Sequence, residues 1–179
     1  MYDHTSGLRL TLKACPIVTI VTIAICYLTQ LVAGWFGIDL PEQNNLAIVR
    51  QMAGWNLSFA LVILQIVLIL PAIEEFLFRG LLFRLPARHF CRDRLGPSIV
   101  VAAIAAAIFS FGHYPDWVGL FKGGAFTVRS ADNAFVALWF FGFAQCGLYR
   151  RTGSIKYPIL NHMLFNAINL VLLFLIPQS

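Results

Sequence analysis

Long apolar runs without charged residues alternate with short charged segments along the whole chain. The five longest uncharged runs are Ala14–Ile38, Gln51–Ile73, Leu95–Pro115, Asn133–Tyr149 and Tyr157–Ser179. A helix needs about 20 mostly apolar residues to cross a membrane. The pattern therefore predicts five membrane helices, which we place at residues 14–36, 57–84, 97–113, 134–150 and 157–176.

The amino-acid composition agrees with this pattern. Charged residues make up 12% of the 179 residues, against about 25% in an average soluble domain. Hydrophobic residues make up 59%, and the mean hydropathy is +0.78. A water-soluble chain of this size would expose large apolar patches. The sequence therefore predicts an all-α fold, a polytopic membrane helix bundle that forms a single integral membrane domain over residues 1–179.

The first apolar run has the basic residues Arg9 and Lys13 before it, as a signal peptide does. The run is longer than the usual 7–15 residues of a signal peptide, and no A-x-A-like cleavage site closes it. We therefore expect residues 14–36 to form a retained signal-anchor helix.

Basic residues are distributed unequally between the two faces that five spans create. One face holds nine of them: Arg9, Lys13, Arg84, Arg88, Arg92, Arg94, Arg150, Arg151 and Lys156. The opposite face holds three: Arg50, Lys122 and Arg129. Positive residues favour the cytoplasmic side, so we expect a cytoplasmic N-terminus and an external interfacial segment at residues 114–133. Anionic lipid accounts for the net charge of +5, so no nucleic-acid partner is expected.

Ionisable and amide side chains occur inside three of the five predicted helices, where the bilayer penalises them. The second helix contains Glu74, Glu75 and Arg79, the third ends at His113, and the fifth contains Asn161, His162, Asn166 and Asn169. An ionisable residue costs about 2.5–3.5 kcal/mol at a helix centre on insertion scales. Residues that persist at this cost are candidates for a functional site.

Helical spacing sorts these groups into faces. Glu75 and Arg79 are four residues apart and so can pair on one face, whereas Glu74 is rotated by about 100° from Glu75. The i, i+4, i+7 spacing places His162, Asn166 and Asn169 in one polar stripe.

Two further spacings concern the surroundings of these groups. Phe109 and His113 are also four apart, so the two rings are expected to pack together. Pro71 removes a helix hydrogen bond one turn before Glu74, and a kink there would open room for water or substrate.

Each group also has a purely structural interpretation. Glu75 and Arg79 make a simple ion pair, His113 alone resembles an interfacial histidine, and each asparagine alone would join helices at about 0.6 kcal/mol. Glu74 has no obvious local partner. The conjunction of an unpaired carboxylate, two histidines and an amide stripe in one small bundle favours a catalytic site.

Three motifs on successive helices resemble those of a known family. They are Glu-Glu-x-x-x-Arg at 74–79, Phe-x-x-x-His at 109–113 and His-x-x-x-Asn at 162–166. In this order they resemble the CAAX protease and bacteriocin-processing family of glutamate-type intramembrane proteases. The resemblance runs from about Gln65 to Leu170, and it implies a catalytic core at about 57–176 with one extra N-terminal helix.

The resemblance implies an intramembrane endopeptidase that cleaves a membrane-associated peptide or protein tail without a metal or cofactor. Glu74 matches the general base that activates water, and His113 matches the histidine that helps to hold this water. His162 and Asn166 match the pair that stabilises the oxyanion. Glu75 and Arg79 match the remaining motif positions, to which we assign an orienting, charge-balancing role.

Other functions remain open at this stage. Two glutamates and two histidines are also the ligand types of a zinc-dependent membrane protease, although no His-Glu-x-x-His spacing occurs. Intramembrane Glu and His also serve in transporters, although no inverted repeat occurs here. A non-catalytic peptide-binding or immunity protein would have the same fold.

The sequence supports only general expectations about the cellular membrane and the substrate. We expect a prokaryotic plasma membrane because the chain is short and no targeting segment is evident. The substrate classes left open are a prenylated tail, a bacteriocin or leader peptide, and a C-terminal sorting signal.

Overall fold

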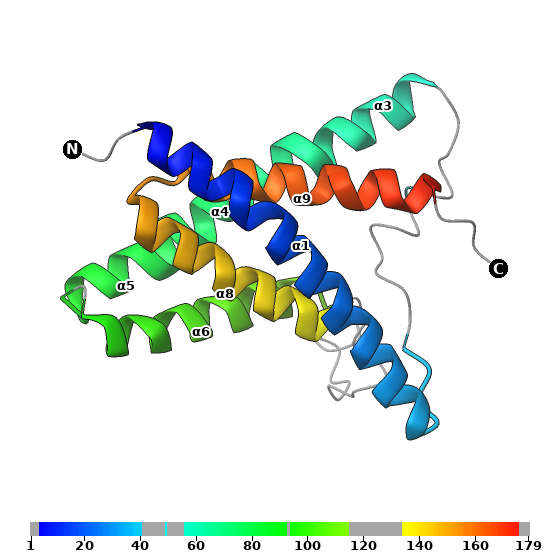
Figure 1. Cartoon of the computed structure of the whole chain (residues 1–179), viewed down its shortest axis with the longest axis horizontal. Helices are drawn as coiled ribbons and strands as arrows, with labels where there is room; N and C mark the ends of the chain where they lie inside the picture. The colour runs from blue at the N-terminus through cyan, green and yellow to red at the C-terminus, as the bar shows by residue number, and fades with distance from the viewer. Residues whose placement is uncertain (1–3, 41–48, 50–55, 93, 115–133, 176–179) are drawn as a thin grey trace, which may run out of the picture.

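The computed structural model describes residues 4–40, 49, 56–92, 94–114 and 134–175. Five long helices make up this part of the chain, and the predicted all-α bundle is confirmed (Figure 1). They are α1 (His4–Trp35), the continuous helix Leu57–His89, α6 (Leu95–Gly112), α8 (Phe135–Thr152) and α9 (Lys156–Leu175). The predicted interfacial segment 114–133 lies outside the described residues, apart from Tyr114.

Four of these helices are long and apolar enough to cross a membrane. They are Thr5–Trp35, Leu57–His89, Leu95–Gly112 and Lys156–Leu175. The remaining helix, α8, corresponds to the predicted span 134–150. It contains Gln145 and ends with Arg150 and Arg151, and these residues lower its mean hydropathy. Its burial explains how it tolerates polar groups, because α8 packs against α1, α6 and α9.

The first two helices extend beyond the predicted bounds. α1 begins at His4 rather than at residue 14, and the second helix continues to His89 rather than ending at 84. The 32 residues of α1 correspond to about 48 Å at 1.5 Å per residue, which exceeds the roughly 30 Å of a hydrocarbon core. The helix α1 therefore includes Arg9 and Lys13, which precede the apolar run from which the span was predicted.

The helix Leu57–His89 is not regular. It consists of α3 (Leu57–Leu64), the π-helical segment η1 (Gln65–Ile69), α4 (Leu70–Glu75), the π-helical segment η2 (Phe76–Phe83) and α5 (Arg84–His89). Each π segment ends shortly before a proline, Pro71 or Pro86. Proline lacks the N–H that a regular helix requires, and π segments often occur at functional sites. Glu74 and Glu75 lie between the two.

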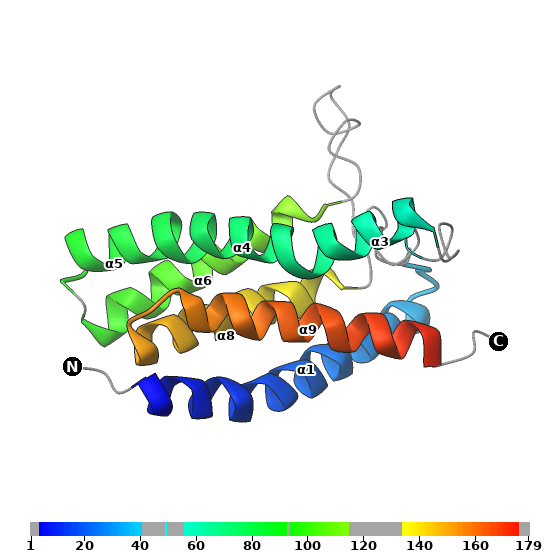
Figure 2. The ribbon, with the colours of Figure 1, turned by 90° about the horizontal axis from the view of Figure 1, so that it is seen from above.

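The helices form a flattened bundle in which α8 and α9 lie between α1 and the helix Leu57–His89 (Figure 2). The helix Leu57–His89 and α1 lie on opposite sides of the bundle. The N-terminus, the α5–α6 turn and the α8–α9 turn lie at one end (Figure 1). α1 approaches α9 closely, since a Cβ at Gly7 would lie 2.3 Å from the Tyr157 ring.

Candidate active site

Glu74, His113 and His162 meet inside the bundle, although they come from three different helices. Oε1 of Glu74 lies 3.8 Å from Nε2 of His113, and its Oε2 lies 3.7 Å from Nε2 of His162. The Glu74 side chain is 23% exposed and that of His113 is 19% exposed. These distances exceed a direct hydrogen bond. The three groups therefore face one another, and the side chains of Glu74 and His113 are partly exposed.

Glu75 has a different environment from its neighbour. Its side chain is fully buried, and its Oε2 lies 3.1 Å from Nε of Arg79, which is 1% exposed. Its Oε1 lies 2.9 Å from Nδ1 of His162. The predicted pairing of Glu75 with Arg79 is thus confirmed. Because burying an isolated carboxylate is costly, Glu75 depends on both partners.

The hydrogen bonds fix which ring nitrogen of each histidine carries a proton. Nδ1 of His113 lies 2.9 Å from the carbonyl oxygen of Phe109, which only accepts. Nδ1 of His162 faces the carboxylate of Glu75, which also accepts when ionised. Both Nδ1 atoms therefore donate, and Nε2 of each ring, which is directed toward Glu74, carries a lone pair in the neutral imidazole and a proton in the imidazolium.

The Phe109 ring connects the three motifs. It is fully buried, and its centroid lies 4.7 Å from the His113 ring, 6.0 Å from the His162 ring and 4.7 Å from Cζ of Arg79. The predicted packing of Phe109 with His113 is confirmed. A cation over an aromatic face is stabilised by the ring quadrupole, so Phe109 stabilises the buried guanidinium group of Arg79.

Arg79 also reaches α8 through a glycine. Its Nη2 donates to the carbonyl oxygen of Gly142 at 3.1 Å. A Cβ at Gly142 would lie 3.1 Å from Phe109 and 3.2 Å from the backbone of Ala106. The missing side chain therefore permits the close approach of α6 and α8 that brings this carbonyl within reach of Arg79.

Gln145 is a polar residue of the site that sequence reasoning missed. It is fully buried in α8. Its Nε2 donates to the carbonyl oxygen of Pro158 at 3.1 Å and lies 3.5 Å from Oε1 of Glu75, and its Oε1 accepts from Nδ2 of Asn161 at 3.0 Å. An amide in the middle of an apolar run was the signal available in the sequence.

Asn166 contacts the backbone of the π segment η1. The N–H of Leu70 donates to the carbonyl oxygen of Gln65, five residues back. In this register the next carbonyl, that of Ile66, would accept from residue 71, but Pro71 has no N–H. Nδ2 of Asn166 donates to Ile66 O at 2.9 Å. A π segment therefore precedes Pro71, and Asn166 donates to the carbonyl to which a proline cannot donate.

The predicted polar stripe of α9 divides in the structure. His162 and Asn166 both reach the helix Leu57–His89. Asn169 instead donates to the carbonyl oxygen of Phe165 in its own helix. Among the described residues, no group of three or more His, Cys, Asp and Glu side chains has a metal-binding arrangement.

The fold and the site define a polytopic membrane protein with a carboxylate–histidine centre inside its helix bundle. The family model for type II CAAX prenyl endopeptidase Rce1-like proteins matches residues 56–168, more than half of the chain. The chain belongs to this Rce1-like family, in agreement with the resemblance of its three motifs. No curated protein and no solved structure matches the chain. Family and fold together identify an integral membrane protease with a membrane-associated protein substrate.

Proposed function

We propose that this protein is a glutamate-type intramembrane endopeptidase in which Glu74 activates the attacking water. One observation supports this role most directly. Glu74 faces the Nε2 atoms of His113 and His162 at 3.8 and 3.7 Å, whereas the adjacent Glu75 is committed to Arg79 and His162. Of the two glutamates, only Glu74 is partly exposed, at 23%, whereas Glu75 is fully buried.

In the proposed reaction, the Glu74 carboxylate takes a proton from water while the water oxygen bonds to the scissile carbonyl carbon. The carbonyl electron pair moves onto its oxygen and gives a tetrahedral oxyanion. When this intermediate collapses, the carbonyl re-forms, the carbon–nitrogen bond breaks, and Glu74 returns its proton to the leaving nitrogen. The products are a carboxylic acid and an amine. His113 orients the water through the lone pair of Nε2.

The proposed oxyanion donors are His162 and Asn166. Because Nδ1 of His162 already donates to Glu75, Nε2 donates to an oxyanion only as the imidazolium, which the Glu75 carboxylate stabilises. Nδ2 of Asn166 has two hydrogens, and one of them is used by Ile66. The second is the hydrogen that would reach the oxyanion.

The proposal includes a membrane arrangement. We infer a catalytic core at about 57–176, an additional N-terminal helix, and a cytoplasmic N-terminus in a prokaryotic plasma membrane. The cleaved bond lies in a membrane-associated peptide or protein tail. Two observations support this arrangement. Nine basic residues lie on one predicted face, and the N-terminus, the α5–α6 turn and the α8–α9 turn lie at the same end of the bundle (Figure 1).

The variant Glu74→Gln tests the proposal, because it preserves side-chain size and removes the base. Purified protein is assayed on a membrane peptide substrate, with Asp39→Asn as a matched control that removes an exposed carboxylate outside the site. We expect Glu74→Gln to remain folded and bind substrate with turnover at background, while Asp39→Asn retains full activity. Substantial cleavage by Glu74→Gln would contradict the proposal.

Metal removal separates the glutamate mechanism from the zinc alternative. We expect a strong chelator to leave cleavage by the parent enzyme unchanged. Cleavage that is lost with chelator and restored by added zinc would instead assign a metalloprotease, because a catalytic metal is removed and replaced in this way.

A further inference from the structure

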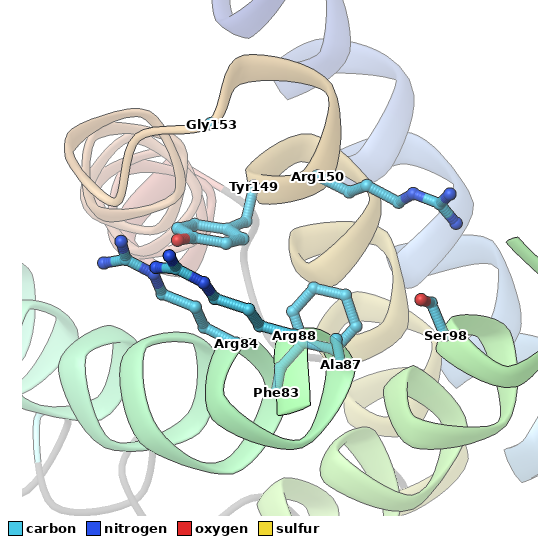
Figure 3. A pocket seen from close by; sticks show the side chains of 8 residues that line it. All are labelled: Phe83, Arg84, Ala87, Arg88, Ser98, Tyr149, Arg150 and Gly153. Atoms are coloured by element: carbon cyan, nitrogen blue, oxygen red, sulfur yellow. The ribbon is translucent and has the colours of Figure 1, made fainter. Parts of the chain in front are cut away.

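A pocket at one end of the bundle lies outside the catalytic centre. Its cavity volume is about 500 Å³, within the roughly 300–1,000 Å³ typical of small-ligand sites. It is bounded by the end of η2, α5, the start of α6 and the end of α8 (Figure 3). Its polar lining consists of Arg84, Arg88, Ser98, Tyr149 and Arg150.

Two arginines give the pocket its charge. Arg84 and Arg88 are exposed and one helical turn apart on α5, and their side chains run side by side toward Tyr149 (Figure 3). Arg150 points the other way in this view. Two like charges at i and i+4 repel each other. An anion bound between them would relieve this repulsion.

The described part of the chain contains no acidic partner for this pair. Its acidic residues are Asp39, which contacts Gln30, and Glu74 and Glu75, which belong to the catalytic centre. Asp93, the nearest acidic residue along the sequence, lies outside the described residues. Within the described structure, the charge of Arg84 and Arg88 is therefore left for an external anion.

The wall opposite the arginines is held in place by the end of α8. Tyr149 is mostly buried, and its ring packs edge-on against Phe83 with centroids 6.1 Å apart. Gly153 follows α8 as its C-terminal cap; its φ of +65° is left-handed, and its N–H donates to Tyr149 O at 2.7 Å. Glycine adopts this conformation without strain. The phenol is thus fixed beside the two guanidinium groups.

Apolar side chains are exposed on the same helices. Leu81 and Leu82 in η2 and Leu85 in α5 are 40–47% exposed, and Phe90 just after α5 is 85% exposed. A free inorganic anion has no apolar part that could contact such a surface. A cationic pocket adjoining exposed apolar helices matches an amphiphile with an anionic head and acyl chains.

We propose that this pocket binds the headgroup phosphate of an anionic phospholipid. Arg84 and Arg88 contact the phosphate oxygens, for which guanidinium is well suited, and the Tyr149 hydroxyl donates to the same group. The acyl chains lie along the apolar faces of η2 and α5. The proposal is independent of the catalytic mechanism, since none of these residues contacts Glu74, His113 or His162 in the structure.

The experiment measures lipid binding to the full chain in detergent micelles. Phosphatidylglycerol is titrated, phosphatidylcholine is the zwitterionic comparison, and inorganic phosphate is the soluble comparison; binding is read by native mass spectrometry and by the thermal unfolding shift. Arg84→Gln/Arg88→Gln tests the pocket. Arg94→Gln/Arg151→Gln removes the same charge at the same end of the bundle without altering the pocket lining.

We expect phosphatidylglycerol to bind the parent protein more tightly than phosphatidylcholine does. The pocket variant should weaken this binding by about tenfold or more, and the control variant by less than about twofold. Tyr149→Phe, which keeps the ring, should weaken it less than the arginine variant does. If the pocket variant fails to fold, Arg84→Gln and Arg88→Gln are measured singly.

Two results would overturn the proposal. Equal weakening in the pocket and control variants would show that only the overall charge of this end attracts lipid. Saturation by millimolar inorganic phosphate, with no added effect of phosphatidylglycerol, would assign the pocket to a soluble phosphate rather than to a lipid.

Discussion

Nδ1 of His162 lies 2.9 Å from Oε1 of Glu75, joining α9 to α4 across 87 positions of the sequence. Glu75 also pairs with Arg79 at 3.1 Å. The contact therefore turns the other nitrogen of His162 toward Glu74, which lies 3.7 Å away. Two adjacent glutamates thereby have different surroundings: Glu75 is buried between Arg79 and His162, and Glu74 is partly exposed beside His113 and His162.

Removing Arg79 should be more harmful than removing the whole ion pair. Arg79→Leu leaves the fully buried Glu75 carboxylate without its cation, and breaking a buried pair in this way costs about 3–5 kcal/mol. We expect Glu75→Gln/Arg79→Leu to recover much of the lost stability, because no buried charge remains. Folded yield and the thermal midpoint in one detergent measure the difference.

Glu75→Gln alone provides the comparison for this pair, since its amide oxygen still accepts from His162. If the double variant is as unstable as Arg79→Leu, the charge pairing is not the main role of Arg79. Its hydrogen bond to Gly142 and its cation–π contact with Phe109 then contribute more to stability than the ion pair does.

Gln145 should contribute to stability through its contacts with Pro158 and Asn161. Gln145→Leu leaves these buried polar groups without their partner, which costs about 1–3 kcal/mol. The matched control is Asn169→Leu, because the Asn169 amide bonds only within its own helix. We expect a clearly lower thermal midpoint for Gln145→Leu and a small change for the control. Equal midpoints would contradict a role for Gln145 in joining α8 to α9.

Local spacing predicted contacts within a helix, but not the links between helices. The i, i+4 rule placed Glu75 beside Arg79 and Phe109 beside His113, and both contacts are confirmed. The role of Gln145 depends on α8 lying between its neighbours, which no spacing within one helix reveals. The polar stripe of α9 likewise predicted one face but not that Asn169 turns back to Phe165.

The π segments were not predicted, because each apolar run was taken to form a regular α-helix. A span of apolar residues is the same for an α-helix and for a π segment, so η1 and η2 leave no signal in hydropathy. Pro71 indicated an irregularity but not its form. The length of α1 was also underestimated, because the helix begins at His4, before its apolar run.

Reporter fusions at Cys91 and after Ser179 test the membrane orientation. The basic-residue asymmetry predicts that the α5–α6 turn lies in the cytoplasm and the C-terminus outside. We therefore expect a cytoplasmic signal from the first fusion and an external signal from the second, measured with paired phosphatase and fluorescent reporters. Equal signals at the two positions would contradict the five-helix topology.

The His162→Ala and Asn166→Ala variants test the oxyanion assignment. Loss of an oxyanion donor slows turnover by about 100-fold or more, and we expect this loss in both variants, measured as kcat on a membrane peptide. For Asn166, however, the structure also shows a bond to Ile66 O in η1. A loss of activity in Asn166→Ala therefore has two possible causes, disruption of η1 or loss of the donor.

A change at Pro71 separates these two causes. Pro71→Ala restores the N–H that would bond to Ile66 in the π register, so it should offset the loss of the Asn166 amide in Pro71→Ala/Asn166→Ala. Pro71→Ala alone is the control and should retain activity. If Asn166 donates to the oxyanion, the double variant recovers the thermal midpoint of the control while its kcat stays about 100-fold lower. Recovery of both stability and kcat would assign Asn166 to supporting η1 and leave His162 as the remaining proposed donor.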